Sequence, residues 1–323
     1  MTPPTSHIPG HETAADRLRG VVAILIAATI WGSLPLVLHQ VDGSSLIKVF
    51  FRVAIAFVAM TGFLMATGRL QRAFTLDRKL ITNMIIQGVI LGINWSLFLG
   101  AFELASVATV ELLMYMGPVI VAIIAPFTLK DPFDRRILLP LALSFGGLLT
   151  ILVPQGVSFS GSELIGAAMA FSSSFTYAIL MVRNKRFVTN VSGAVVVWFG
   201  YVGSLLFLTP LAVWQFAVGN GPTGGIADYG WFAILGVGQT AVASLFFFYG
   251  LKRLRAEESS VLTYMEPVTA VIFAAMVLGE PIVLTTAIGG ILVVAGGTMV
   301  ARMQAQRGLE LVPVEAGAVE DDG

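Results

Sequence analysis

The sequence contains no cysteine, only three histidines and few charged residues. The absence of cysteine excludes disulfides, thiolate metal sites and cysteine nucleophiles. His7 and His11 lie in the polar N-terminal segment, and His39 ends the first apolar run. No zinc site and no Ser-His-Asp set can therefore be built within an apolar segment. We expect no metal or other cofactor, and an enzyme is disfavoured.

The scarcity of charge is the second informative absence. Charged residues make up 12% of the 323-residue chain, whereas hydrophobic residues make up 56%. A soluble domain carries about a quarter charged residues. A chain with half that fraction cannot cover its surface with polar groups, so we expect an integral membrane protein whose main surroundings are the lipid bilayer. We expect it to bind no nucleic acid and to need no protein partner.

Long apolar runs predict the fold class. A membrane-spanning helix needs about 20 predominantly apolar residues. An all-α integral membrane protein of ten spanning helices is therefore predicted, with spans at 18–38, 45–66, 80–102, 106–127, 135–153, 161–182, 192–215, 229–251, 257–279 and 282–302. The polar segments 1–16 and 304–323 have no apolar periodicity, so we expect them to be disordered tails.

The basic residues predict the orientation of the spans. If the N-terminus is cytoplasmic, every Lys and Arg except Lys48 and Arg52 lies on the cytoplasmic side. This bias is the one that the positive-inside rule describes. We therefore expect both termini to be cytoplasmic in a multi-pass protein of the cytoplasmic (inner) membrane.

An internal repeat divides the chain into two halves. A shift of 149 residues aligns "MYMGPVIVAIIAPFTLKDP" (114–132) with "TYMEPVTAVIFAAMVLGEP" (263–281), with eight identities in nineteen positions. Each half, 17–155 and 156–303, holds five spans. Because five is odd, the second half must enter the membrane from the opposite side. Inverted repeats of this kind are typical of transporters with a substrate site near the midplane between the halves.

These motifs carry a resemblance to a known family. The segments "MEPVTAVIFAAMVLGEP" (265–281), "MGPVIVAIIAPFTLKDP" (116–132) and "AATIWGSLPLV" (27–37) resemble the EamA-type exporters of the drug/metabolite transporter superfamily. Within it, the chain is similar to the YddG-like aromatic amino-acid exporters. The resemblance implies two inverted five-helix repeats around a central cavity, and only the resemblance implies export rather than import. The first half departs from the pattern, since Gly117 stands where the second half has Glu266.

Prolines and carboxylates within spans are candidates for coupling or gating. Pro118 and Pro267 are repeat equivalents that remove a backbone donor and bend their helices. Glu111 and Glu266 also lie within spans, where a carboxylate is costly and is a functional-site hypothesis by default. A proton-linked role and a purely structural role both remain open for these carboxylates.

Polar and aromatic residues near span midpoints are the candidate substrate contacts. Together they predict a neutral, partly aromatic cavity rich in hydrogen-bonding groups, with no basic residue at mid-depth. Such a cavity suits a neutral or zwitterionic small molecule and does not suit a phosphorylated one. Packing between helices is the competing explanation for each of them. The candidates are Trp31, Ser33, Gln87, Asn94, Trp95, Tyr115, Ser173, Tyr177, Gln239 and Tyr264.

Other aromatic and small residues have simpler explanations. Trp198, Trp214, Tyr229 and Trp231 lie toward span ends, where aromatic belts form. The "FFFYG" run (246–250) is interpreted as lipid-facing or packing surface. A stripe of small residues at four-residue spacing predicts close approach of the third span to another helix. The stripe consists of Gly88, Gly92, Ser96 and Gly100.

Three classes of function remain. The favoured one is a secondary transporter that exports amino acids, aromatic or other hydrophobic ones, and similar metabolites by alternating access. The alternative within the same fold is a multidrug or cationic-compound exporter. An intramembrane enzyme would need a buried His-carboxylate or basic-carboxylate cluster, and a sensory protein would need a large soluble domain; the sequence suggests neither.

Overall fold

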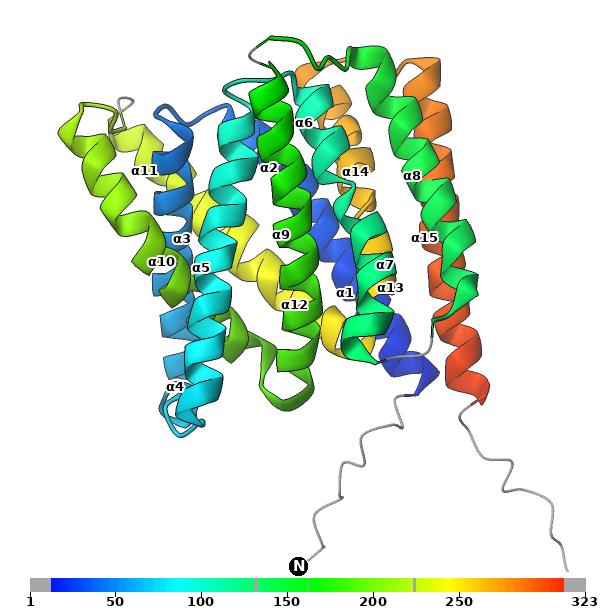
Figure 1. The fold of residues 1–323 in the computed structure, drawn as a ribbon, viewed down its shortest axis with the longest axis horizontal. Helices are drawn as coiled ribbons and strands as arrows, with labels where there is room; N and C mark the ends of the chain where they lie inside the picture. The colour runs from blue at the N-terminus through cyan, green and yellow to red at the C-terminus, as the bar shows by residue number, and fades with distance from the viewer. Residues whose placement is uncertain (1–12, 131–132, 162, 223–224, 311–323) are drawn as a thin grey trace, which may run out of the picture.

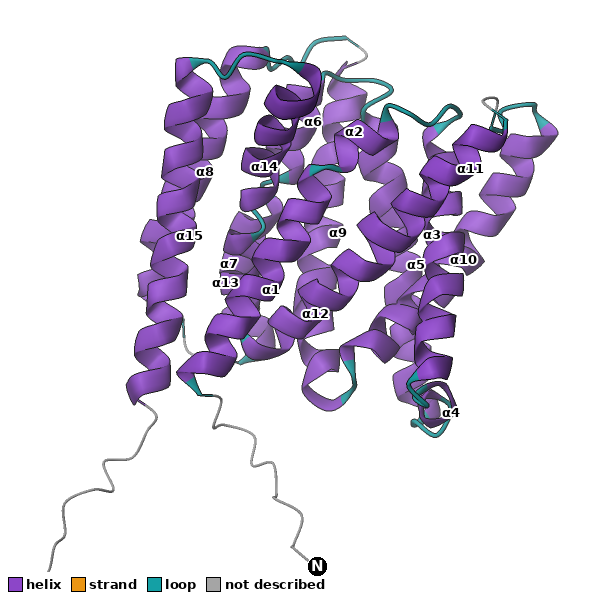
Figure 2. Ribbon diagram, turned by 180° about the vertical axis from the view of Figure 1, so that it is seen from behind, coloured by secondary structure: helices purple, strands orange, loops and turns teal. Residues whose placement is uncertain are grey.

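The computed structural model describes residues 13–130, 133–161, 163–222 and 225–310. Within these residues every regular element is helical (Figure 2). Ten helical segments are long and apolar enough to cross a membrane, the first at Ala14–Leu38 and the last at Leu284–Gln306. The predicted all-α membrane fold with ten spans is confirmed.

The first half contains spans one to five, and two of these spans are interrupted. The first span breaks at Ser33, between α1 and α2, and the fourth breaks at Tyr115–Met116, between α6 and α7. Each break is followed within three residues by a proline, which cannot donate the helical hydrogen bond. The elements are α1 (Ala14–Gly32), α2 (Leu34–Leu38), α3 (Ser45–Ala66), α4 (Leu70–Ala73), α5 (Arg78–Ala101), α6 (Val107–Met114), α7 (Gly117–Leu129), a 3₁₀ turn (Arg135–Ile137), α8 (Leu138–Leu152) and a second 3₁₀ turn (Val153–Gln155).

The second half contains spans six to ten. Its ninth span breaks at Thr263–Tyr264, in the position equivalent to the break in the fourth span. Two π-helical segments, Ile234–Val242 and Ala274–Leu278, widen the eighth and ninth spans. The α-helices are α9 (Glu163–Asn190), α10 (Gly193–Ala217), α11 (Ile226–Ala233), α12 (Ala243–Arg253), α13 (Ala256–Leu262), α14 (Met265–Phe273) and α15 (Leu284–Glu310).

The helices stand roughly side by side, and α1 begins and α15 ends at the same end of the bundle (Figure 1). We call this end the terminal end and the opposite end the distal end. Helices α8 and α15 pack together at one side of the molecule, and α3, α5 and α10 pack at the other. The broken spans and the eighth span lie between these groups, which places irregular backbone in the protein interior, where other protein groups can satisfy it.

Helix starts in the first half carry capping residues. The side chains of Thr13, Ser44, Asp77 and Ser106 each accept a hydrogen bond from a backbone N–H in the first turn that follows. Such caps satisfy donors that have no partner within the helix. These residues therefore fix where α1, α3, α5 and α6 begin.

Glycines permit the close approach that the small-residue stripe predicts. A Cβ atom at Gly88 would collide with the Gly200 carbonyl oxygen, and one at Gly203 would collide with the Ile85 carbonyl oxygen. Helices α5 and α10 thus meet backbone to backbone. Gly147 and Gly289 play the same part between α8 and α15.

The helical boundaries correct the expected tails. Thr13 caps a helix that begins at Ala14, and α15 continues past residue 303 to Glu310, with Gln304 buried in this extension. Residues 1–12 and 311–323 lie outside the described residues.

The assignment of Trp198 to an aromatic belt was wrong, since its ring is buried and its Nε1 donates to Thr61 Oγ1 at 2.8 Å.

Candidate functional site

A cavity of about 160 Å³ lies between the two halves. Its volume is comparable to the ~150 Å³ cavity that a benzene molecule can fill. Both halves contribute to its wall, and aromatic side chains form much of it. The polar and aromatic residues of the wall are Trp31, Arg52, Gln87, Asn94, Trp95, Phe98, Tyr115, Tyr177, Asn184, Tyr201, Gln239, Thr240, Ser244, Phe247, Phe248, Thr263 and Glu266.

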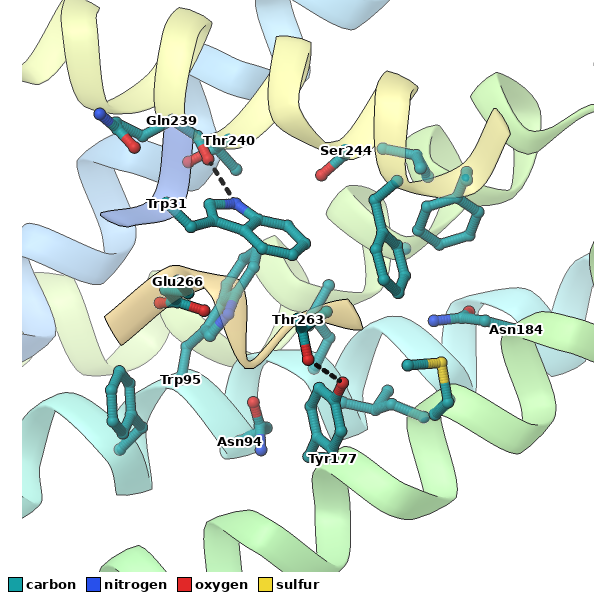
Figure 3. A pocket seen from close by; sticks show the side chains of 18 of the residues that line it. Trp31, Asn94, Trp95, Tyr177, Asn184, Gln239, Thr240, Ser244, Thr263 and Glu266 are labelled. Carbon is teal, nitrogen blue, oxygen red and sulfur yellow. Dashed lines mark hydrogen bonds between the residues drawn. The ribbon is translucent and has the colours of Figure 1, made fainter. Parts of the chain in front are cut away.

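The first and eighth spans meet through Trp31, Ser33 and Gln239. The Trp31 indole Nε1 donates to the Gln239 carbonyl oxygen at 3.0 Å, as Figure 3 shows. The Gln239 amide Nε2 donates to Ser33 Oγ at 2.6 Å, while Gln239 Oε1 is buried and accepts no hydrogen bond from the described residues. Ser33 therefore orients Gln239 from behind the cavity wall.

Asn94 and Gln87 join the third and sixth spans. Asn94 Nδ2 donates to Ser173 Oγ at 3.0 Å and to the Ser173 carbonyl oxygen at 2.8 Å. Gln87 Nε2 donates to Asn184 Oδ1 at 3.0 Å, and Gln87 Oε1 accepts from Arg183 Nε at 2.6 Å. Both amides line the cavity, but several of their hydrogen-bonding positions are already used between helices. Ser173 is fully buried behind Asn94 and does not reach the cavity.

The breaks of the fourth and ninth spans touch each other. The Tyr264 hydroxyl donates to the Tyr115 carbonyl oxygen at 2.8 Å, and the two rings lie with centroids 5.9 Å apart. Tyr264 is fully buried and, unlike Tyr115, does not line the cavity. Since neither tyrosine sits within a continuous helix, this bond satisfies a carbonyl that the break in the fourth span exposes.

The two carboxylates occupy different positions. Glu266, in the first turn of α14, lines the cavity, faces Tyr115 and interacts electrostatically with Arg52 and Glu111. Glu111 lies on α6, is half-buried and does not form part of the cavity wall. Pro118 is part of the wall, whereas its equivalent Pro267 is buried behind it.

Tyr177 and Trp95 supply aromatic surface from the sixth and third spans. The Tyr177 hydroxyl lies 3.4 Å from Thr263 Oγ1, across the ninth-span break, in the contact drawn in Figure 3. Its ring packs over Gly117, where a Cβ atom would come within 2.6 Å of the ring. The glycine in the first-half motif therefore makes room for Tyr177.

Arg52 corrects the expectation of a cavity without basic residues. Its side chain is only 3% exposed and lines the cavity. Counted from Ser45, where α3 begins, Arg52 lies about 10 Å along the helix, at a rise of about 1.5 Å per residue. The charge pattern placed it on the outer side and not at mid-depth. The signal that could have identified it is the rule that an ionisable residue within a span marks a functional site.

Several further wall residues were also missed. Phe247 and Phe248 belong to the run interpreted as lipid or packing surface, yet both line the cavity, and Phe247 packs against Trp31 with ring centroids 5.3 Å apart. Tyr201 donates its hydroxyl proton to the Thr240 carbonyl oxygen or to Ser244 Oγ, each at 3.0 Å. Tyr201 lies near the midpoint of the predicted span 192–215, so the criterion used for the other candidates could have found it, whereas Phe247 and Phe248 lie near the end of their predicted span.

Residues of the cavity wall lie toward both ends of the bundle. Asn184 and Val197 lie in the terminal halves of α9 and α10, whereas Phe98 lies in the distal half of α5. A separate apolar cluster fills the space above it at the distal end. This distal cluster consists of Leu34, Val37, Val41, Ile47, Ala212, Phe232 and Leu235.

The fold and the site define a class of protein: a multi-pass membrane protein with two five-helix halves and a central cavity, built as transporters are. The sequence matches the EamA-like transporter family over residues 18–153 and again over 164–302. Together these ranges cover most of the chain, so the chain belongs to the EamA-like transporter family.

Similar proteins agree with this assignment. An uncharacterized transporter of Archaeoglobus fulgidus is 27% identical over 280 residues, covering 86% of this chain and 94% of that protein. The uncharacterized transporter YyaM of Bacillus subtilis is 26% identical over 238 residues, covering 68% of this chain and 72% of its own length. The crystal structure of another protein shares the fold, with a TM-score of 0.74 at 19% identity. The match covers 92% of this chain and 100% of that chain.

Proposed function

We propose that this protein is a secondary transporter that exports amino acids, aromatic or other hydrophobic ones, and similar small metabolites across the cytoplasmic membrane. The observation that carries the proposal is the cavity between the two halves, whose wall combines Trp31, Trp95 and Tyr177 with the amides of Asn94 and Gln239. Aromatic faces receive an apolar side chain, and amide groups receive the polar end of a small molecule.

The charge distribution supports a cytoplasmic location of both termini. Basic residues gather at the terminal end, for example Arg69, Arg72, Lys252 and Arg253, as expected for the cytoplasmic side. In this orientation an exporter loads its substrate at the terminal end of the bundle.

Alternating access is the mechanism that the arrangement supports. The distal cluster, which includes Leu34, Val37 and Phe232, excludes water from the outer end. Opening that end requires the helices that carry the cluster to separate. The breaks at Tyr115 and Tyr264 let short helical segments reorient without disrupting the hydrogen bonds of a long helix. No ATP-binding motif is present in the sequence, so an ion gradient or the substrate gradient would drive transport.

A second candidate function is the export of cationic compounds. Glu266 places a carboxylate in an aromatic cavity, an arrangement that attracts cations. Arg52 in the same wall opposes this binding, so we rank the cationic exporter second.

Transport in proteoliposomes tests the proposal. Vesicles containing the purified protein are loaded with labelled phenylalanine, tryptophan, threonine or a cationic drug, and efflux is followed with and without a proton gradient. We expect saturable efflux of the aromatic amino acids. Efflux that ignores the gradient and survives both Glu111→Gln and Glu266→Gln would make the carboxylates structural, and movement of the cation alone would favour the drug exporter.

A further inference from the structure

The cavity wall contains a positive charge, Arg52, that has no ion-pair partner among the described residues. Ion pairs among the described residues join Arg19 to Asp16 and Arg255 to Glu257, and Arg52 takes part in neither. Its side chain is nonetheless 3% exposed and reaches the cavity. A buried charge without a direct ion-pair partner costs several kcal/mol unless other groups compensate it. A buried charge that lines a cavity lies where a ligand can add to that compensation.

The guanidinium is held along one edge. Its Nε donates to Thr240 Oγ1 at 3.1 Å, and Thr240 Oγ1 in turn donates to the Leu235 carbonyl oxygen at 2.7 Å. The guanidinium carbon lies 4.7 Å from the centroid of the Trp95 ring, which supports the flat face. The two Nη groups donate no hydrogen bond within the described part of the chain. Their paired N–H groups match the geometry of a carboxylate.

A negative pole lies in the same cavity on the other repeat. Glu266 on α14 lines the wall and interacts electrostatically with Arg52 on α3, but the two do not form a direct ion pair. Trp31, Trp95 and Tyr115 line the same cavity as these two residues. A positive and a negative group on separate helices that line one cavity are complementary to a molecule that carries both charges.

We propose that Arg52 binds the carboxylate of a zwitterionic α-amino acid and that Glu266 binds its ammonium group, with the side chain among the aromatic rings. This inference rests on the proposed function, because the ligand is the transported substrate. It assigns the cavity to molecules that carry a carboxylate and an amine, and it ranks amines without a carboxylate, and acids without an amine, as poorer ligands.

A panel of matched probes tests the inference on the full-length protein. Phenylalanine carries both charged groups, phenethylamine lacks the carboxylate, and 3-phenylpropionate lacks the amine. Binding of each is measured by calorimetry and by the thermal stabilisation that a ligand specific for the folded state produces. We expect phenylalanine to bind about 10- to 100-fold more tightly than either fragment, since each charged hydrogen-bonding group contributes that much.

Three variants test which residue binds the carboxylate and which binds the ammonium group. Arg52→Gln is expected to weaken phenylalanine and phenylpropionate binding about 10- to 100-fold while leaving phenethylamine binding unchanged or stronger. Glu266→Gln is expected to weaken phenethylamine binding while leaving phenylpropionate binding unchanged or stronger. Arg52→Lys keeps the positive charge but loses the paired N–H groups of the guanidinium, so it should retain part of the carboxylate binding. It also provides a folded variant if Arg52→Gln does not assemble.

Lys48→Gln is the matched control. Lys48 is the other basic residue of α3, lies one turn nearer the distal end, and donates to the Leu38 carbonyl oxygen outside the cavity. The variant removes one positive charge from the same helix and should leave the ranking of the three probes unchanged.

The outcomes separate this inference from the proposed function. If the wild-type protein binds none of the three probes, the amino-acid cavity itself is overturned. If it binds and transports phenylalanine but Arg52→Gln keeps the wild-type preference over phenethylamine, only the role of Arg52 is overturned. If Lys48→Gln changes the ranking as Arg52→Gln does, long-range charge rather than direct contact explains the preference, and the inference fails.

Discussion

The broken fourth and ninth spans are repeat equivalents, and they differ at the residue before the proline. The fourth span has Gly117 before Pro118, and the ninth has Glu266 before Pro267. Gly117 lies under the Tyr177 ring with no room for a side chain, whereas Glu266 carries a carboxylate into the cavity. The same backbone break therefore serves aromatic packing in one half and charge in the other.

The tyrosines at the two breaks show the same asymmetry. The Tyr264 hydroxyl donates to the carbonyl oxygen of Tyr115, whereas Tyr115 faces Glu266 and lines the cavity. An ancestral repeat with two identical halves would have a symmetric site. The difference between Gly117 and Glu266 gives the cavity a distinct charged side, which a molecule with two unlike ends requires.

Gly117→Glu should produce the largest effect, because it gives the first break the residue of the second. The new side chain would collide with the Tyr177 ring, and overpacking of this kind costs about 1–3 kcal/mol before the added charge is counted. We expect a lower unfolding temperature in detergent and loss of transport. Gly146→Ala is the control, since a Cβ there meets nothing within 4 Å. A Gly117→Glu protein as stable and active as wild type would contradict the packing described for Tyr177.

Glu266→Gln should reduce amino-acid transport by about tenfold or more with little change in unfolding temperature, because it removes a charged hydrogen-bonding group from the cavity. Glu111→Gln should change it by only about twofold, because Glu111 lies outside the wall. Initial rates of saturable efflux measure both. Equal losses in the two variants would show that the carboxylates act as one unit.

Tyr264→Phe should lower the free energy of unfolding by about 1 kcal/mol, because the Tyr115 carbonyl oxygen loses its donor. Tyr115→Phe should change stability less and substrate affinity more, since its hydroxyl faces Glu266 in the cavity. Thermal unfolding and binding, measured on both variants, separate these effects. The reverse pattern would mean that the two tyrosines have exchanged the roles described here.

The smallest effect concerns the turn after each broken span. Lys130 and Gly279 are repeat equivalents, and both adopt the left-handed conformation, with φ of 59° and 70°. A residue with a side chain is strained in this conformation, so Lys130→Gly should raise the free energy of unfolding by about 0.5 kcal/mol and Gly279→Lys should lower it by about 1 kcal/mol. Unfolding curves of the pair, with transport unchanged, would test whether the two turns are conformationally the same.

The spans and the repeat could be predicted because each depends on a signal spread over many residues. Hydropathy over about 20 residues places a span, and eight identities in nineteen positions place the repeat. The interruptions followed from Pro118 and Pro267, because proline removes a donor wherever the helix lies. These features do not depend on how the helices pack.

The cavity wall was only partly predictable, because it depends on which way each side chain faces. Trp31, Asn94 and Gln239 were recovered, yet Ser33, Ser173 and Tyr264 lie behind the wall as supports. The sequence position of a mid-span polar residue indicates its depth in the membrane, but it does not show which way the side chain faces. Arg52 was missed for the opposite reason, since its depth was misjudged.

The most direct test of the account is whether substrate passes through this cavity. Gly200 lines the cavity, and a Cβ there meets only a Leu91 methyl at 4.0 Å, so Gly200→Phe can place a ring in the cavity without a clash at the backbone. Efflux of labelled phenylalanine from proteoliposomes would be compared for the wild-type protein and this variant. The account predicts saturable efflux that Gly200→Phe abolishes while the protein stays folded. Undiminished efflux through the folded variant would show that the transport path lies elsewhere.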